Sequence, residues 1–143
     1  MDLGLAGLGR MGGNIATRLV RGGHRVVGYD PSATAREAAQ AQGMEAAASL
    51  RDLVAALKGP RAVRVMVPAG EATENALRDL AELLAPGGIL DGGNTHYKHD
   101  VRRAATLTPR GLHYVDAGVS GGIWGLSEGY CLMIGGEPAA ATT

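Results

Sequence analysis

Short apolar runs alternate along the chain with longer segments in which apolar residues recur at helical spacing. The short runs are bounded by glycine, proline or aspartate, as buried strands are, and they fall at 3–6, 25–29, 62–67, 89–91, 113–117 and 130–134. Between them, the periodicity predicts helices over 14–20, 33–42, 49–57, 73–85 and around 101–107. Strands that alternate with helices favour right-handed crossovers. The pattern therefore predicts an α/β protein with a doubly wound, mostly parallel sheet and helices on both faces.

The first predicted helix follows a glycine-rich turn, Gly7-Leu8-Gly9-Arg10-Met11-Gly12, directly after the first strand. Gly7 permits a tight turn, Gly9 lets a pyrophosphate approach bare backbone, and Gly12 lets the helix pack closely on the strand. The helix N-terminus presents free N–H groups and a partial positive charge to phosphates. A strand, a glycine turn and a helix in this order predict a Rossmann-type dinucleotide site.

Asp30 strengthens this interpretation. It ends the second apolar run and lies 18 residues beyond Gly12, close to the roughly 20-residue interval expected for the acid that binds the adenosine ribose. The alternative is a purely structural strand–helix–strand unit whose second strand happens to end in aspartate before a turn at Pro31. The spacing favours the dinucleotide site.

Composition narrows the class of protein. A chain of 143 residues is most naturally one domain. Lys plus Arg and Asp plus Glu number 14 each, so the neutral chain has no general attraction for nucleic acid or an anionic membrane. No apolar run approaches the ~18 residues that span a bilayer. Cys131 is the only cysteine, and we expect it to be a buried, inert thiol. With no possible intramolecular disulfide and no signal peptide, we expect a cytoplasmic protein.

Ligands of doubly wound sheets lie outside the carboxyl ends of the strands. The loops expected there hold nearly all the glycine clusters and non-repetitive polar residues, and they are 7–12, 30–32, 67–70, 91–96 and 117–125. In one of them, Asn94 could orient a nicotinamide amide or a substrate hydroxyl. It could equally be a helix N-cap, a position for which Thr95 competes.

Ser120 lies in another of these loops, between glycines. The sequence G-x-S-G-G is not a nucleophile elbow, and no partner base is evident. A hydrogen bond from Ser120 to a substrate carboxylate or hydroxyl is the better interpretation, with a tight turn as the alternative. The histidines do not form a metal-binding set, and Arg102 and Arg103 are predicted to be solvated on an exposed helix face. Trp124 could cover an active site or dock a further domain.

Taken together, the motifs resemble the 6-phosphogluconate dehydrogenase family, the decarboxylating enzymes. The resemblance covers residues 1 to about 138, and it rests on GLGRMG at 7–12, VPAG at 67–70, DGGN at 91–94 and GVSGG at 118–122. The segment 123–136 is similar to the shorter branch of the family, whose members often favour NAD. Two alternatives are kept: a β-hydroxyacid dehydrogenase of the 3-hydroxyisobutyrate type, which shares GVSGG in part, and a non-catalytic NAD-binding module.

The resemblance implies a role for each matching position. The turn from Gly7 to Gly12 would hold the pyrophosphate and Asp30 the adenosine ribose. Asn94 would touch both nicotinamide and substrate. The nucleotide cleft would be lined by Val67, Pro68 and Ala69, and the sugar acid would be bound by Ser120, Gly121 and Gly122. The NADP-dependent branch has Asn-Arg-Thr where this chain has Asp30-Pro31-Ser32, and Lys in place of Pro68. NAD is therefore expected rather than NADP.

Members of the family oxidise a substrate hydroxyl by hydride transfer, lose carbon dioxide and tautomerise the enediol to ribulose 5-phosphate. The resemblance thus implies 6-phosphogluconate as substrate, a place in the pentose phosphate pathway and a homo-oligomer at full length. The family's catalytic Lys, its acid Glu and its all-helical domain correspond to positions beyond residue 143. We therefore expect residues 1–138 to form the dinucleotide-binding domain, 139–143 to be a tail at the start of a helical domain, and the chain alone to be inactive.

Overall fold

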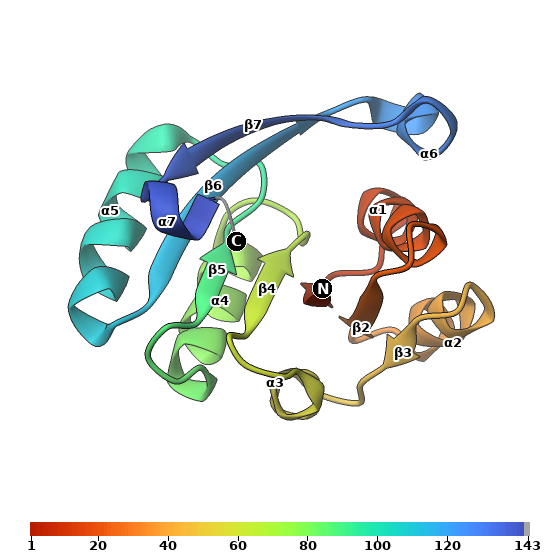
Figure 1. Cartoon of the computed structure of the whole chain (residues 1–143), viewed down its shortest axis with the longest axis horizontal. Coiled ribbons are helices and arrows are strands. Elements are labelled where there is room, and N and C mark those ends of the chain that lie inside the picture. Colours follow the sequence, from red (N-terminus) through yellow and green to blue (C-terminus); the bar gives the residue numbers. More distant parts are fainter. Residues whose placement is uncertain (142–143) are drawn as a thin grey trace.

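The structure, a computed structural model, describes residues 1–141, without the side chain of residue 123. Its centre is one seven-stranded sheet in the order β3-β2-β1-β4-β5-β6-β7 (Figure 1). The strands are β1 Asp2–Ala6, β2 Arg25–Tyr29, β3 Glu45–Ala46, β4 Ala62–Val65, β5 Ile89–Asp91, β6 His113–Ser120 and β7 Cys131–Gly136. All neighbouring strands pair parallel except β7, which is antiparallel to β6. The predicted Rossmann-type, mostly parallel sheet is confirmed.

Helices join the strands, as the periodicity predicted. They are α1 Arg10–Arg21, α2 Ala33–Ala41, α3 Leu50–Ala56, α4 Glu71–Leu83, α5 Tyr97–Leu107, α6 Gly125–Glu128 and α7 Pro138–Ala141, with short 3-10 turns at Thr108–Arg110 and Gly122–Trp124. Helix α4 begins at Glu71 rather than at Thr73, because Gly70 is its N-cap and the Thr73 hydroxyl donates to the carbonyl of Pro68. Among residues 1–141, no helix has the length and apolar content to span a bilayer.

Two strands differ from the prediction. Strand β3 has no apolar run of its own, and it exists because Glu45 and Ala46 pair with the buried strand β2. Strand β6 runs on to Ser120, since the antiparallel partner β7 pairs along it as far as Cys131 opposite Ser120. Residues 118–120, which we had expected in a loop, are therefore held in a ladder of backbone hydrogen bonds.

The two faces of the sheet are covered unequally. Helices α3, α4 and α5 pack over one face, where a continuous apolar core joins residues of β1, β2, β4, β5 and β6. Helices α1 and α2 pack over the opposite face, where the core is small and contains only Leu5, Leu8, Ala16, Val26, Ala39 and Met44 among its buried members. The larger core thus extends under nearly every strand, and the smaller one only under β1 and β2.

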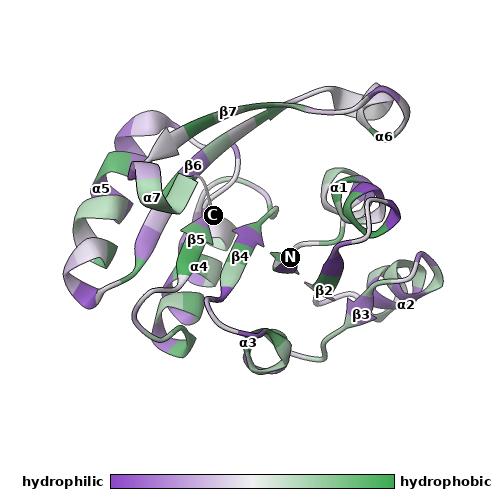
Figure 2. Cartoon of the chain, in the orientation of Figure 1, coloured by the Kyte–Doolittle hydropathy of each residue, from purple (hydrophilic) through white to green (hydrophobic). Residues whose placement is uncertain are grey.

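Beyond β1, the face that carries α1 is largely open. A groove of about 180 Å³ crosses it, lined by side chains of β4, β5, β6 and β7, and helix α7 lies over one end of it, with Ala140 buried. Figure 2 shows the hydrophobic residues along β7 at the rim of the molecule. Leu132 is 49% and Ile134 51% exposed. Cys131 is also exposed, so the prediction of a buried thiol is wrong, because β7 is an edge strand whose residues are all exposed.

Candidate cofactor site

The backbone of the glycine turn allows α1 to pack closely on the sheet. Gly7 has a φ of 102°, and its N–H donates to the carbonyl of Tyr29 at 2.8 Å. A Cβ on Gly12 would overlap the carbonyl oxygen of Gly7, whereas a Cβ on Gly9 would meet nothing within 4 Å. Gly7 and Gly12 are thus needed for the packing of α1 on the sheet. Gly9 instead leaves open space, which fits the close approach of a phosphate.

Helix α1 begins at this turn without a side-chain cap. Its N-cap is Gly9, and no acidic residue lies in its first turn. The first N–H groups and the positive end of the helix dipole therefore remain available to an anion. Arg10 is exposed there, Leu8 and Gly12 are buried, and Met11 is half-buried. A groove of about 520 Å³ starts beside these residues and runs between α1 and α2.

The structure brings Asp30 against the glycine turn. One carboxylate oxygen, Oδ2, accepts the N–H of Leu8 at 2.9 Å, and Oδ1 accepts the N–H of Ser32 at 2.9 Å. A carboxylate oxygen has room for a second hydrogen bond, so both oxygens can still accept from ribose hydroxyls. Arg36 does not pair with this carboxylate, because its Nη1 donates to the backbone carbonyls of Asp30 and Pro31.

The end of β4 lies on the other side of the turn. A Cβ on Gly7 would lie 3.1 Å from Cγ1 of Val67, so Val67 borders the turn directly. Val67 is half-buried, and Pro68 and Ala69 are exposed beyond it. The predicted nucleotide residues of β1, β2 and β4 are therefore neighbours at one edge of the sheet.

The side chain of Asn94 is hydrogen-bonded to the backbone near the end of β6. Its Nδ2 donates to the carbonyl of Val119 at 3.1 Å, and its Oδ1 accepts the N–H of Val119 at 2.7 Å. Both helix-cap alternatives are wrong, since the N-cap of α5 is His96 and the Thr95 hydroxyl donates to Asp100. Asn94 is exposed, and its amide keeps one N–H and one acceptor position for a ligand.

Ser120 is the last residue of β6 and is exposed. Gly121 and Gly122 follow with φ values of 142° and 50°, a left-handed backbone that glycine adopts readily. Within residues 1–141, the polar contacts of the histidines are with Met1, Glu74, the N–H of Lys98 and Glu137, so no imidazole pairs with Ser120. The same residues hold no group of three or more His, Cys, Asp and Glu side chains that could hold a metal ion.

A buried ion pair that was not predicted from the sequence lies beneath these residues. Arg64 in β4 donates through Nη1 to Oδ2 of Asp91 and through Nη2 to the carbonyl of Ala117 at 2.8 Å. Oδ1 of Asp91 accepts the N–H of Gly93 at 2.9 Å. Burial raises the pKa of Asp91, and the charge of Arg64 and the N–H of Gly93 oppose the rise. A charged residue inside an otherwise apolar strand was the signal that could have revealed the pair.

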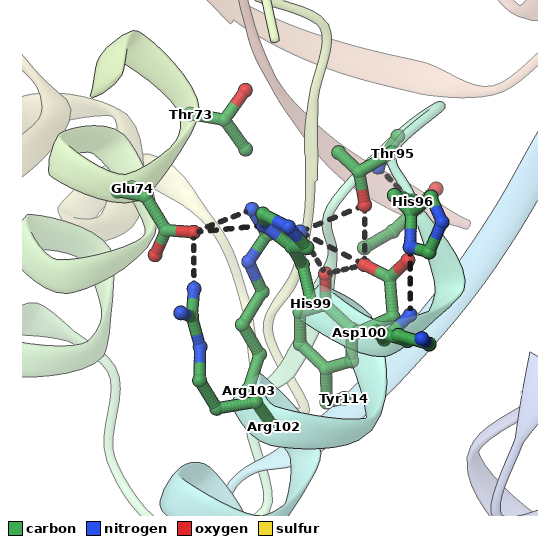
Figure 3. Close-up of polar contacts among 12 residues, drawn as sticks. Thr73, Glu74, Thr95, His96, His99, Asp100, Arg102, Arg103 and Tyr114 are labelled. Atoms are coloured by element: carbon green, nitrogen blue, oxygen red, sulfur yellow. Dashed lines mark hydrogen bonds and ion pairs between the residues drawn. The ribbon is translucent and has the colours of Figure 1, made fainter. Parts of the chain in front are cut away.

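A second polar network lies between α5 and the sheet (Figure 3). Arg103 is its centre, with a side chain only 6% exposed, so the prediction of a solvated Arg103 is wrong. Its guanidinium donates to Asp100 and Thr95 at 2.8 Å each, to Glu74 at 2.8 Å and to the Tyr114 hydroxyl at 3.3 Å. Helix α5 therefore turns a charged face toward the sheet.

This network reaches the loop that carries Asn94. The Tyr114 hydroxyl donates to Oδ1 of Asp100 at 2.7 Å, and a Cβ on Gly92 would overlap that hydroxyl. Burial raises the pKa of Asp100, but hydrogen bonds from Thr95, Tyr114 and Arg103 outweigh it and leave the pKa below its usual range. The loop from Gly92 to Thr95 thus packs against the hydrogen-bonded side chains of Tyr114 and Asp100.

Comparison with known proteins agrees with this geometry. Residues 2–143 match the family model of the NAD binding domain of 6-phosphogluconate dehydrogenase. The chain is 43% identical over 137 residues to the NAD(+)-dependent, decarboxylating 6-phosphogluconate dehydrogenase of Haloferax volcanii, a match that covers 95% of this chain and 45% of that protein. The chain thus spans less than half the length of this relative.

Solved structures share the fold. The 6-phosphogluconate dehydrogenase of Plasmodium falciparum, described with its cofactor NADP+ and its substrate, superposes with a TM-score of 0.91 at 27% identity, over 98% of this chain and 32% of that one. The 3-hydroxyisobutyrate dehydrogenase of Mycobacterium tuberculosis gives a TM-score of 0.87 at 28% identity, over 97% of this chain and 47% of that one.

Proposed function

This chain belongs to the 6-phosphogluconate dehydrogenase family, whose NAD-binding domain it matches, and on that premise we propose that it binds NAD at the carboxyl ends of β1, β2 and β4. The observation that carries the proposal is the place of Asp30, hydrogen-bonded to the N–H of Leu8 beside the open backbone of Gly9. The pyrophosphate would lie on the N-terminus of α1. The adenosine ribose would lie on Asp30 and the nicotinamide near Asn94.

We propose further that NAD is preferred to NADP. A 2′-phosphate on the ribose would meet the negative charge of Asp30 at close range. Arg36, the nearest cation on α2, is already bonded to two backbone carbonyls, so it does not neutralise that carboxylate. The name of the Haloferax relative as NAD(+)-dependent supports the same preference.

Calorimetric titration of the chain with NAD and NADP tests both statements. We expect NAD to bind at least about tenfold more tightly, because close like charges oppose the 2′-phosphate. Asp30→Asn should narrow this preference, since it removes the repulsive charge. Glu37→Gln, at an exposed position of α2, is the matched control and should leave the preference unchanged. Tighter binding of NADP to the unaltered chain would contradict the preference, and binding of neither cofactor would contradict the proposed function.

For the whole protein, we propose the oxidative decarboxylation of 6-phosphogluconate to ribulose 5-phosphate, carried out as a homo-oligomer. NAD, when bound, would supply the hydride acceptor. Ser120, Gly121 and Gly122 would bind the sugar acid, and Asn94 would orient it against the nicotinamide. The similarity to a 3-hydroxyisobutyrate dehydrogenase makes 3-hydroxyisobutyrate the competing substrate, and turnover of the two substrates by a protein of full length would separate them.

The 143-residue chain alone should be catalytically silent. Removal of the hydroxyl proton needs a base within about 3 Å. The lysines of this chain are Lys58, two residues after the end of α3, and Lys98, exposed in the first turn of α5, and neither lies at the end of a strand. We expect the chain to bind NAD but to form no NADH with 6-phosphogluconate. Steady turnover in a spectrophotometric assay would refute this expectation.

A further inference from the structure

Arg64 and Asp91 form a buried ion pair that takes no part in the proposed contacts with the cofactor. Their side chains are 9% and 13% exposed. Each nitrogen of the Arg64 guanidinium that makes a hydrogen bond has a different partner: Nη1 donates to Asp91 in β5, Nη2 to the carbonyl of Ala117 in β6, and Nε to the sulfur of Met66 after β4. One side chain therefore joins the carboxyl ends of three neighbouring strands.

Two of the partners of Arg64, Asp91 and Ala117, lead directly to the loop that carries Asn94 and to the end of β6 at Ser120. Asp91 accepts the N–H of Gly93, the residue before Asn94. Ala117 lies in β6, three residues before its end at Ser120. The side-chain amide of Asn94 in turn forms hydrogen bonds to the N–H and the carbonyl of Val119 in β6. The spacing between the Asn94 loop and the end of β6 is thus fixed at two points, by the hydrogen bonds of Arg64 within the sheet and by those of Asn94 to Val119.

Stability alone does not account for an arginine at this place. Removing two charges from water is expensive, and replacing a buried ion pair with apolar residues of similar volume is often neutral or stabilising. The neighbours Val63 and Val65 are buried in the apolar core of the opposite face. What an arginine offers here, and an apolar side chain does not, is a set of directional hydrogen bonds that specify one geometry.

We propose that Arg64 is a positioning residue, which holds the Asn94 loop and the end of β6 at Ser120 at the separation that the nicotinamide half of the cofactor requires. This inference rests on the proposed function. It assigns no contact between Arg64 and the cofactor, since Arg64 acts through Asp91 and Ala117. Lysine could not replace it fully, because a single ammonium group lacks the planar fork that reaches both partners at once.

Two ligands that differ only in the nicotinamide half provide the test. NADH and ADP-ribose share the adenosine, the pyrophosphate and the second ribose. Each is titrated calorimetrically against the chain and its variants. Arg64→Met should weaken NADH by about tenfold, as the loss of a well-placed hydrogen bond to the nicotinamide would, and should leave ADP-ribose within about twofold. Arg64→Lys should recover part of the NADH affinity, and Asp91→Asn should behave as Arg64→Met does.

Arg61→Met is the matched control, because Arg61 precedes β4 at the opposite edge of the sheet and donates to the carbonyl of Leu57. It should leave the ratio of NADH to ADP-ribose affinity unchanged. ADP-ribose binding also reports that each variant is folded. If Arg64→Met, Arg64→Lys and Asp91→Asn all keep the ratio of the unaltered chain, the positioning role is overturned while the proposed cofactor site stands. If the unaltered chain binds neither ligand, the proposed function fails and the positioning role fails with it.

Discussion

One face of the sheet is closed from β2 to β6, and the other is closed over only part of its strands. On the closed face, Leu53 of α3, Leu80 of α4 and Leu90 of β5 are fully buried between the helices and the sheet. On the partly open face, the core under α1 and α2 ends at β1, and Leu132 and Ile134 of β7 are half-exposed. The same sheet is therefore stabilised in two different ways along its width.

The division coincides with the two halves of the candidate site. The glycine turn and Asp30 stand over strands packed by helices on both faces, where apolar burial provides the stability. Asn94 and Ser120 stand over strands with one open face, where Arg64 lines the groove, and the network around Arg103 supports the same strands from the face that α5 covers. Apolar packing is non-directional, whereas hydrogen-bonded charges specify a geometry. The nucleotide half is thus held mainly by apolar packing, whereas the proposed nicotinamide half is held by apolar packing on one face together with polar contacts.

Breaking the polar support under α5 should have the largest effect on stability. Arg103→Met would leave the carboxylate of Asp100 buried without its cation, which costs about 3–5 kcal/mol of unfolding free energy. Arg102→Met is the control, because Arg102 binds the same Glu74 from a side chain that is 62% exposed, and such pairs contribute at most about 1 kcal/mol. Urea unfolding measures both. Equal losses would show that burial of the network is unimportant.

The two faces should also respond differently to truncation of an apolar side chain. Leu80→Ala would leave a cavity in the closed core and should cost about 2–5 kcal/mol. Leu132→Ala removes a side chain that is already 49% exposed, so the loss should stay within roughly 0.5 kcal/mol. Thermal or urea unfolding of the two variants measures the contrast, and similar losses would mean that the open face is covered in solution.

Removing one hydrogen bond of the network around Arg103 tests how the stability of the chain depends on pH. Tyr114→Phe removes the hydroxyl that donates to Asp100 and should cost about 1–2 kcal/mol at neutral pH. The folded pKa of Asp100 is lowered, so its contribution is present above the unfolded pKa of about 3.9 and is lost as the pH falls through the folded pKa. The difference between Tyr114→Phe and the unaltered chain should therefore shrink below about pH 4.

Urea unfolding at several pH values measures that difference. Tyr97→Phe is the control, because Tyr97 is 62% exposed on α5 and should show no difference at any pH. A gap for Tyr114→Phe that is constant from neutral pH to pH 3 would contradict the assignment of the network to the ionised form of Asp100.

Most of the fold could be predicted because its signals are local. The glycine turn, Ser49, which caps α3 by accepting the N–H of Asp52, and the apolar runs of β1, β2 and β5 each specify their element within a few residues. Strand β3 could not be predicted, because Glu45–Ala46 has no periodicity and exists only through its partner. The extension of β6 to Ser120 likewise depends on pairing with β7, which the sequence does not encode locally.

The candidate site divides in the same way. The positions of Asp30 and Asn94 at strand ends followed from spacing and from the rule that parallel strands end at one edge. Most partners of Arg64, Arg103 and Asn94 did not, because they lie on another strand, helix or loop, and because charge at helical spacing normally indicates a solvated face. Such contacts between distant segments become visible only when the chain is folded.

The smallest effect on stability, but a clear effect on association, is expected at the open face itself. Leu132 and Ile134 lie on the same side of β7, an edge strand, where both are about half exposed at the groove of the open face, and contiguous exposed apolar surface promotes association. Ile134→Lys should keep the unfolding free energy within about 0.5 kcal/mol and shift the chain toward monomer in sedimentation equilibrium. Val101→Lys, at a position that is 67% exposed on α5, is the matched control and should not alter the association. If the unaltered chain is monomeric at all concentrations, or if both lysine variants reduce association equally, the open face is not the surface through which copies meet.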